Sequence, residues 1–232
     1  MTGRAAKHSC KTNDHYTPGP YVEATRKALG GSIDLDPASS ALANETVRAT
    51  SFFTKEDNGL NRPWGGAALL NPPGGKLYNA SSQKVWFCKL GGEYVVGRVE
   101  SAIYVGFSLE ILQSAQNLPL GLPTPLDFPC CFPSARMAFD TPVDGRLAKG
   151  TSPTHANVIV FLPRMDDYVV SVESFVDAFS PFGRIVVPPC GLTAVSAQVA
   201  AGKVRDAVAG RGDGLTMTED LLVSLLVQRV AR

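Results

Sequence analysis

The stretch Ala67-Ala68-Leu69-Leu70-Asn71-Pro72-Pro73-Gly74 decides the fold of this chain. Its apolar residues predict a short buried strand that runs up to Asn71. Two consecutive prolines supply no backbone N–H, so they cannot lie in the middle of a sheet and the strand must end there. In sheets that alternate with helices, ligands bind beyond the carboxyl ends of the strands. The sequence therefore predicts that Asn71 lies at a functional edge.

Further strands and helices alternate on both sides of this stretch. The patterns predict helices over 20–29, 39–49, 81–95, 109–116 and 172–179, and strands over 32–36, 101–107, 130–132, 136–139, 157–162 and 184–187. Such alternation is typical of an α/β fold with a mostly parallel sheet. We expect strands 130–132 and 136–139 to form an antiparallel hairpin at one edge of that sheet.

The two ends of the chain differ from its middle. Residues 1–14 are polar and basic, which predicts a flexible basic arm. Residues 191–232 carry two apolar stripes at helical spacing and a capping box at 216–219, which predict a C-terminal helical extension. Residues 15–190 between them are expected to form the main domain.

Composition excludes several classes of protein. The chain has 232 residues, with 22 Lys and Arg against 21 Asp and Glu, so any contact with nucleic acid needs a local basic patch. No apolar run approaches the roughly 20 residues of a membrane span, and the first residues do not form a signal peptide. The 5 cysteines are scattered without zinc-ligand spacing. These features predict a reduced, cytoplasmic protein without a metal and without a membrane partner.

Asn71 has a specific chemical capability. At a rigid strand end, its side-chain carbonyl and a backbone carbonyl can accept both hydrogens of one exocyclic amino group. Accepting them draws the amino nitrogen toward a nucleophilic, tetrahedral form. Such a nitrogen can attack a methyl sulfonium that is held in line, and no strong general base is needed.

The residues around this motif follow one another in an order that resembles a known family. They include His15-Tyr-Thr-Pro18, Ile33-Asp-Leu-Asp-Pro-Ala-Ser39, Phe53-Thr54, Glu56-Asp-Asn-Gly-Leu60, Trp64, Leu70-Asn-Pro-Pro73 and Trp86. Over roughly residues 13–188 the chain resembles the phage-type DNA N6-adenine methyltransferase (Dam) family. The resemblance implies a Rossmann-like class I methyltransferase sheet in residues 15–190, S-adenosylmethionine as cofactor, and methylation of N6 of adenine in DNA. If the chain is phage-encoded, it would act in the host cytoplasm, with or without a partner restriction enzyme.

The resemblance also implies roles for individual residues. The catalytic motif would be Asn71, Pro72, Pro73 and Gly74. The cofactor would meet Tyr16, Thr17, Pro18, Asp34, Asp36, Pro37 and Asp57, with one of the two acids Asp34 and Asp36 holding the ribose hydroxyls and Asp57 meeting the cofactor's adenine amino group. Apart from the resemblance, a basic stretch over 76–98 follows the catalytic motif, where a DNA backbone would pass, although a solvated helix face would carry the same charges. We therefore expect DNA to meet Lys76, Lys84, Trp86, Lys89 and Arg136, and a second candidate patch comprises Arg136, Arg146, Lys149 and Arg164.

Two departures from the family pattern keep alternatives open. Gly74 stands where the family has an aromatic residue that stacks on the extruded base, and Tyr78, Trp86 or Phe87 are candidates to replace it. Asp36-Pro37-Ala38-Ser39 stands where many relatives have a Gly-rich loop. The same fold could instead methylate N4 of cytosine, RNA or a protein amide, or the chain could be a non-catalytic relic that binds cofactor or DNA.

Overall fold

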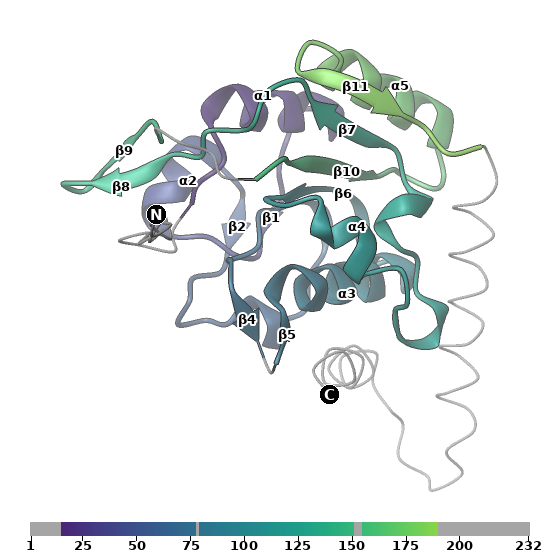
Figure 1. Ribbon diagram of the computed structural model, residues 1–232, viewed down its shortest axis with the longest axis horizontal. Helices are drawn as coiled ribbons and strands as arrows, with labels where there is room; N and C mark the ends of the chain where they lie inside the picture. Colours follow the sequence, from purple (N-terminus) through teal and green to yellow (C-terminus); the bar gives the residue numbers. More distant parts are fainter. Residues whose placement is uncertain (1–14, 78, 151–154, 190–232) are drawn as a thin grey trace, which may run out of the picture.

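The computed structural model describes residues 15–77, 79–150 and 155–189, which fold around one seven-stranded sheet (Figure 1). The strand order is β11-β7-β10-β6-β3-β1-β2. The strands are β1 (Leu35–Asp36), β2 (Ser51–Phe52), β3 (Gly66–Leu70), β6 (Val99–Gly106), β7 (Cys130–Pro133), β10 (Val158–Leu162) and β11 (Gly183–Val186). The predicted arm 1–14, the predicted extension 191–232 and Tyr78 lie outside the described residues.

The sheet is mostly parallel, as the alternating pattern predicts. Strands β2, β1, β3 and β6 pair in parallel, while β10 is antiparallel to both β6 and β7. Strand β7 therefore runs in the same direction as β6, and β11 at the edge is antiparallel to β7. The α/β class and the antiparallel edge are thus confirmed.

One predicted strand is absent from that edge. Residues 136–139 form a loop, and the edge partner of β7 is β11, with Gly183 opposite Pro133. The hairpin prediction for 130–132 and 136–139 is therefore wrong. The backbone N–H of Met137 instead donates a hydrogen bond of 2.7 Å to the Asn157 side chain, so this N–H is not available for strand pairing.

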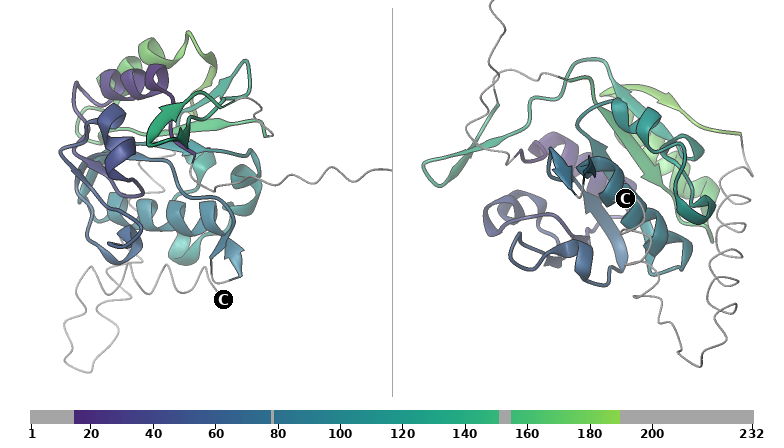
Figure 2. Two further views of the ribbon diagram at one scale, coloured as in Figure 1. Left: turned by 90° about the vertical axis from the view of Figure 1, so that its left-hand side faces the viewer. Right: turned by 60° about the horizontal axis from the view of Figure 1, so that its bottom comes forward.

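Helices cover both faces of the sheet. Figure 2 shows α1 (Gly19–Ala28) and α5 (Tyr168–Phe179) on one side and α3 (Ser82–Val95) on the other. The alternating side chains of β6 divide accordingly: Ile103 and Val105 pack in the cluster of α1 and α5, and Ala102 and Tyr104 in the cluster of α3. The remaining elements are α2 (Ala41–Val47), α4 (Glu110–Ser114), the 3-10 turns at Gly59–Asn61, Pro119–Gly121 and Pro125–Asp127, and the small hairpins β4 (Lys76–Leu77) with β5 (Ala80–Ser81) and β8 (Thr141–Val143) with β9 (Arg146–Ala148). Within the described part of the chain, none of the helices combines the length and apolar character that crossing a membrane requires.

Helix α3 carries a buried ionic cluster. The Glu93 side chain is 0% exposed, and the Lys89 ammonium lies 2.6 Å from its Oε1. Arg98, just beyond the helix, bonds to the second oxygen of the same carboxylate. Lys89 was predicted to contact DNA, but its side chain is only 4% exposed, so it cannot meet a phosphate without opening this pair. That prediction is corrected: Lys89 is a structural partner of Glu93.

Replacing Glu93 should destabilise the protein strongly. Glu93→Ala leaves the buried Lys89 and half-buried Arg98 without their counter-charge, so we expect the free energy of unfolding to fall by about 3–5 kcal/mol. Urea unfolding followed by circular dichroism measures this. Glu100→Ala is the matched control, because the exposed Glu100–Arg164 pair should contribute less than about 1 kcal/mol. Equal losses in the two variants would contradict the structural role of the cluster.

Candidate active site

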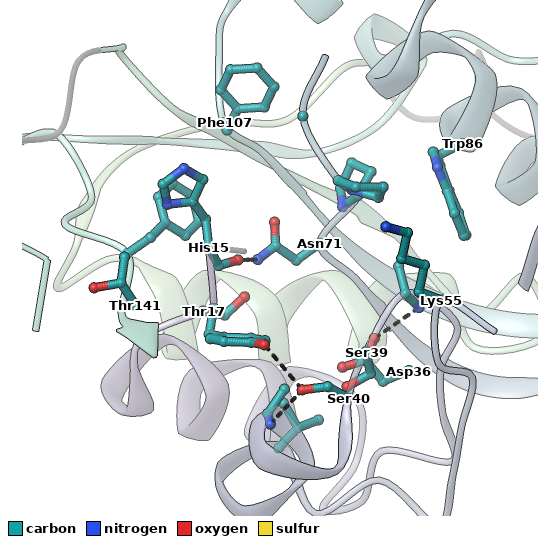
Figure 3. A pocket seen from close by; sticks show the side chains of 18 of the residues that line it. His15, Thr17, Asp36, Ser39, Ser40, Lys55, Asn71, Trp86, Phe107 and Thr141 are labelled. Carbon is teal, nitrogen blue, oxygen red and sulfur yellow. Dashed lines mark hydrogen bonds between the residues drawn. The ribbon is translucent and has the colours of Figure 1, made fainter. Parts of the chain in front are cut away.

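Residues from distant parts of the chain come together at the C-terminal ends of strands β1, β3 and β6. Asp36 ends β1, Asn71 follows β3 and Phe107 follows β6. Because β10 is antiparallel, its preceding residues His155 and Asn157 arrive at the same edge. All five residues line one cavity of about 1630 Å³, shown in Figure 3. Pockets for a single small ligand typically measure roughly 300–1,000 Å³, so this cavity has room for two ligands side by side.

Nine of the sixteen predicted site residues line this cavity. The predicted residues that line it are Tyr16, Thr17, Asp36, Pro37, Asn71, Pro72, Pro73, Gly74 and Trp86. The predicted residues that are not part of its lining are Pro18, Asp34, Asp57, Lys76, Lys84, Lys89 and Arg136. Pro18 instead begins α1 as its N-cap.

Asn71 is held in one orientation. Its side-chain nitrogen donates a hydrogen bond of 2.7 Å to the backbone carbonyl of His15. A carbonyl can only accept, so the amide nitrogen must face His15 and the amide oxygen must face away. Figure 3 shows this oxygen on the side of Asn71 on which Phe107 lies. The site thus presents an oriented acceptor, to which the described residues provide no hydrogen-bond donor.

The segment that orients Asn71 is itself anchored. The backbone N–H of Tyr16 donates to the carbonyl of Asp140 at 2.8 Å, and the N–H of Asp140 donates back to Tyr16 at 2.9 Å. The Tyr16 hydroxyl accepts a hydrogen bond from Ser40 at 3.2 Å. His15, which the sequence analysis assigned no separate role, is therefore part of a fixed wall.

The two candidate acids have different places. Asp34 Oδ2 accepts a hydrogen bond from the backbone N–H of Ala67 at 2.8 Å, so this carboxylate joins the chain before β1 to β3. Asp36 is 5% exposed and lines the cavity. Burial raises the pKa of Asp36 to about 6, although the Ala38 N–H donates to the carboxylate and acts in the opposite sense. Of the two acids, Asp36 is the one that can meet a ligand.

Asp57 organises a loop beside the cavity. Its carboxylate accepts hydrogen bonds from the Thr54 backbone N–H at 2.9 Å and from the Thr54 hydroxyl at 2.8 Å, which hold the pKa of Asp57 below its ordinary value. Its neighbours Lys55 and Asn58 line the cavity instead. Gly59 brings the loop against the Asp36-Pro37 turn, where an added Cβ would lie 2.0 Å from the Pro37 carbonyl oxygen. Only glycine permits this approach.

Basic side chains surround the site unevenly. Lys55 and Lys149 line the cavity, and Lys76 and Arg136 are exposed beside residues that line it. Arg164, by contrast, pairs with Glu100 and Asp166. Lys55 could not be predicted from the sequence, because a single lysine in a turn has no distinctive pattern.

Beside the cavity, Ser82 and Trp86 each carry a buried polar atom without a hydrogen bond to the described part of the chain. Ser82 Oγ and Trp86 Nε1 belong to residues that line the cavity, and neither has a hydrogen-bond partner among the described residues. Buried polar groups are normally satisfied, so these two atoms are exceptions, and with almost no accessible surface they can meet a ligand only if the lining moves. Among the described residues, no group of three or more His, Cys, Asp or Glu side chains is arranged to hold a metal ion.

Asp36 should make the stability of the ligand-free protein depend on pH. Its pKa is raised in the folded state, so the folded state binds more protons than the unfolded state between about pH 4 and 6, and stability falls as pH rises through that window. A shift of about two units corresponds to roughly 3 kcal/mol. We therefore expect Asp36→Asn to raise the free energy of unfolding at pH 8 by up to that amount, and to change it little below pH 4.

Denaturant unfolding at several pH values tests this expectation. Asp34→Asn is the control, because it weakens the bond to Ala67 and should lower stability at pH 8. A pH-independent effect of Asp36→Asn would show that the burial of this carboxylate has no energetic cost.

Comparisons of this chain with protein-family models, with curated proteins and with solved structures found no match. Its function must therefore follow from the site residues themselves: an oriented amide at a strand end, a buried carboxylate, and a cavity large enough for two ligands.

Proposed function

We propose that this chain transfers a methyl group from S-adenosylmethionine to N6 of adenine in DNA. The observation that carries the proposal is the orientation of Asn71, whose amide nitrogen is bound to the His15 carbonyl and whose oxygen is left to accept. The resemblance of the surrounding residues to the adenine methyltransferase family adds the identity of the cofactor and the acceptor base. The cavity volume supports a site at which two ligands meet.

The lining residues form two groups, one at each end of the cavity. Figure 3 shows Asn71 between Asp36 and Ser40 on one side and Phe107 on the other. We assign the Asp36 end to the cofactor, because a buried carboxylate can accept hydrogen bonds from two ribose hydroxyls. The Phe107 end then receives the base.

Asn71 would act on the amino group of that base. Bound S-adenosylmethionine would supply a methyl group on a positively charged sulfur. The Asn71 oxygen and a backbone carbonyl of the Pro72-Pro73 segment would accept the two hydrogens of N6 and direct its lone pair at the methyl carbon. In that transfer a new N–C bond would replace the S–C bond, sulfur would keep the electron pair, and N6 would then lose one proton to solvent.

The base must leave the duplex to reach Asn71. Enzymes that modify a base extrude it into a pocket, and positive side chains hold the backbone outside. The exposed Lys76 and Arg136 and the cavity-lining Lys149 stand at suitable places for this contact. The half-buried Lys84 has less access to a phosphate.

Removing the Asn71 amide should abolish chemistry without abolishing cofactor binding. Because the amide acts mainly in the transition state, Asn71→Ala should lower kcat by about 100- to 1,000-fold. Incorporation of labelled methyl groups into unmethylated DNA gives the rate, and calorimetry gives the cofactor affinity, which should change little.

The same assay separates the alternative acceptors. Cytosine-rich DNA, RNA and protein substrates are assayed in parallel, since cytosine N4 and a glutamine amide also present an NH₂ group. Normal methylation of adenine by Asn71→Ala would refute the mechanism. Cofactor binding without methylation of any substrate by the parent chain would instead favour a non-catalytic relic.

Asp36 should determine cofactor affinity. Removal of a hydrogen bond to a charged group costs roughly 1.5–3 kcal/mol, so Asp36→Ala should weaken S-adenosylmethionine binding by about 10- to 150-fold. Asp34→Ala is the matched control, because its carboxylate bonds to Ala67 and should leave cofactor affinity unchanged wherever the variant is folded. Calorimetric titration distinguishes them, and equal affinities would place the cofactor elsewhere.

A further inference from the structure

Gly74 leaves a space that a neighbouring ring borders. A Cβ atom added to Gly74 would have Phe107 as its nearest neighbour, with the ring atoms Cε1 and Cζ at 3.9 and 4.0 Å. The side chain of any residue at position 74 would therefore start beside the Phe107 ring. Gly74 is not among the glycines with positive φ, so its backbone does not require glycine. Phe107 thus borders the space in which a side chain at position 74 would start.

The backbone around Phe107 is fixed by bonds that do not involve its ring. The Asn157 side chain donates to the Phe107 carbonyl at 3.0 Å and accepts from the Met137 N–H at 2.7 Å. Gly106, directly before it, packs closely against β10, where an added Cβ would lie 2.9 Å from the Val158 side chain. The His155 ring meets the Phe107 ring edge to face, with centroids 5.6 Å apart. The ring is thus held in place, half-buried, with the cavity beside it.

Among the described residues, the other aromatic candidates make contacts elsewhere, and Tyr78 lies outside the described residues. Phe87 is 0% exposed and packs on Tyr104 in the core. Trp86 is 6% exposed and stacks on Trp64, so little of its face is available. Phe139 also lines the cavity, but it packs near His15, on the side to which the Asn71 nitrogen points. Phe107 is on the side of the Asn71 oxygen.

We propose that Phe107 is the stacking platform for the acceptor base in this chain, and that it substitutes from β6 for the aromatic residue missing at Gly74. The inference rests on the proposed function for the identity of the base, but stacking requires only a flat, unpaired nucleobase. A base that stacks on this ring would have its exocyclic amino group within the region that the Asn71 oxygen faces. Base–aromatic stacking of this kind corresponds to roughly 5- to 150-fold in affinity per base.

Binding of single-stranded DNA tests the platform without requiring methyl transfer. Fluorescence anisotropy compares an oligodeoxyadenosine strand with an abasic strand of equal length, so the affinity ratio isolates the contribution of the bases. The parent chain should prefer the strand with bases, and Phe107→Leu should reduce that preference by about 5- to 150-fold. Leucine keeps an apolar side chain at this position but has no aromatic face. Phe182→Leu is the matched control, because this half-buried ring packs on Tyr21, outside the cavity lining.

A second, independent experiment moves the aromatic ring from position 107 to position 74. Gly74→Phe alone should crowd Phe107 and weaken base-dependent binding. The double variant Gly74→Phe with Phe107→Leu should regain most of the preference, because one ring again borders the space. A double variant no better than Phe107→Leu would overturn the equivalence of the two positions.

The outcomes separate this inference from the proposed function. Loss of base preference in Phe107→Leu, with no methyl transfer by the parent to any DNA, would support the platform and overturn the methyltransferase assignment. Adenine methylation by the parent, with base preference and kcat/KM unchanged in folded Phe107→Leu, would overturn the platform and leave the assignment. A parent chain without any base preference would also overturn the platform.

Discussion

The missing N–H groups of Pro72 and Pro73 are the constraint on which the site depends. Strand β3 lies between two other strands, and it ends at Leu70 because residues without an N–H cannot continue the pairing. Because β1 and β6 flank β3 in parallel, the chain leaves all three strands at the same edge. The cavity exists because these neighbouring strands end together, and the residue after β3 is held at its centre.

Main-chain hydrogen bonds then turn this edge into an ordered site. The His15 carbonyl orients the Asn71 amide, and the adjacent Tyr16 is paired with Asp140, so three segments far apart in sequence form one wall. None of these bonds requires a particular side chain at positions 15 or 140, which leaves those side chains free to vary. Asp36, by contrast, lowers the stability of the ligand-free protein. Its burial raises the pKa of the carboxyl group and destabilises the ionised form. The site thus combines the oriented amide oxygen of Asn71 with the buried carboxylate of Asp36.

Local patterns in the sequence were sufficient for most elements but not for their partners. Apolar runs and the two prolines located β3, β6, β7 and β10 to within a few residues. The edge pairing of β7 with β11 and the bond between Met137 and Asn157 both join residues far apart in sequence, so no local pattern contains them. Lys89 resembled a solvated helix residue, yet its partner Glu93, one turn later, is buried with it. Likewise, spacing alone could not distinguish Asp34 from Asp36, because only the bond to Ala67 reveals which acid faces away from the cavity.

If Phe107 is the stacking platform that we propose, a departure from a motif need not remove the function of the missing residue. In the register of the sheet, Leu70 of β3 lies beside Tyr104 of β6, so the residues that follow the two strands share one stretch of the edge. A ring can therefore reach the same space from either strand end, although the two positions are far apart in sequence. A sequence motif that follows a single strand contains only one of these two positions for the ring. Gly74 on its own is therefore weak evidence for a relic, since the ring that borders its vacant side belongs to the neighbouring strand.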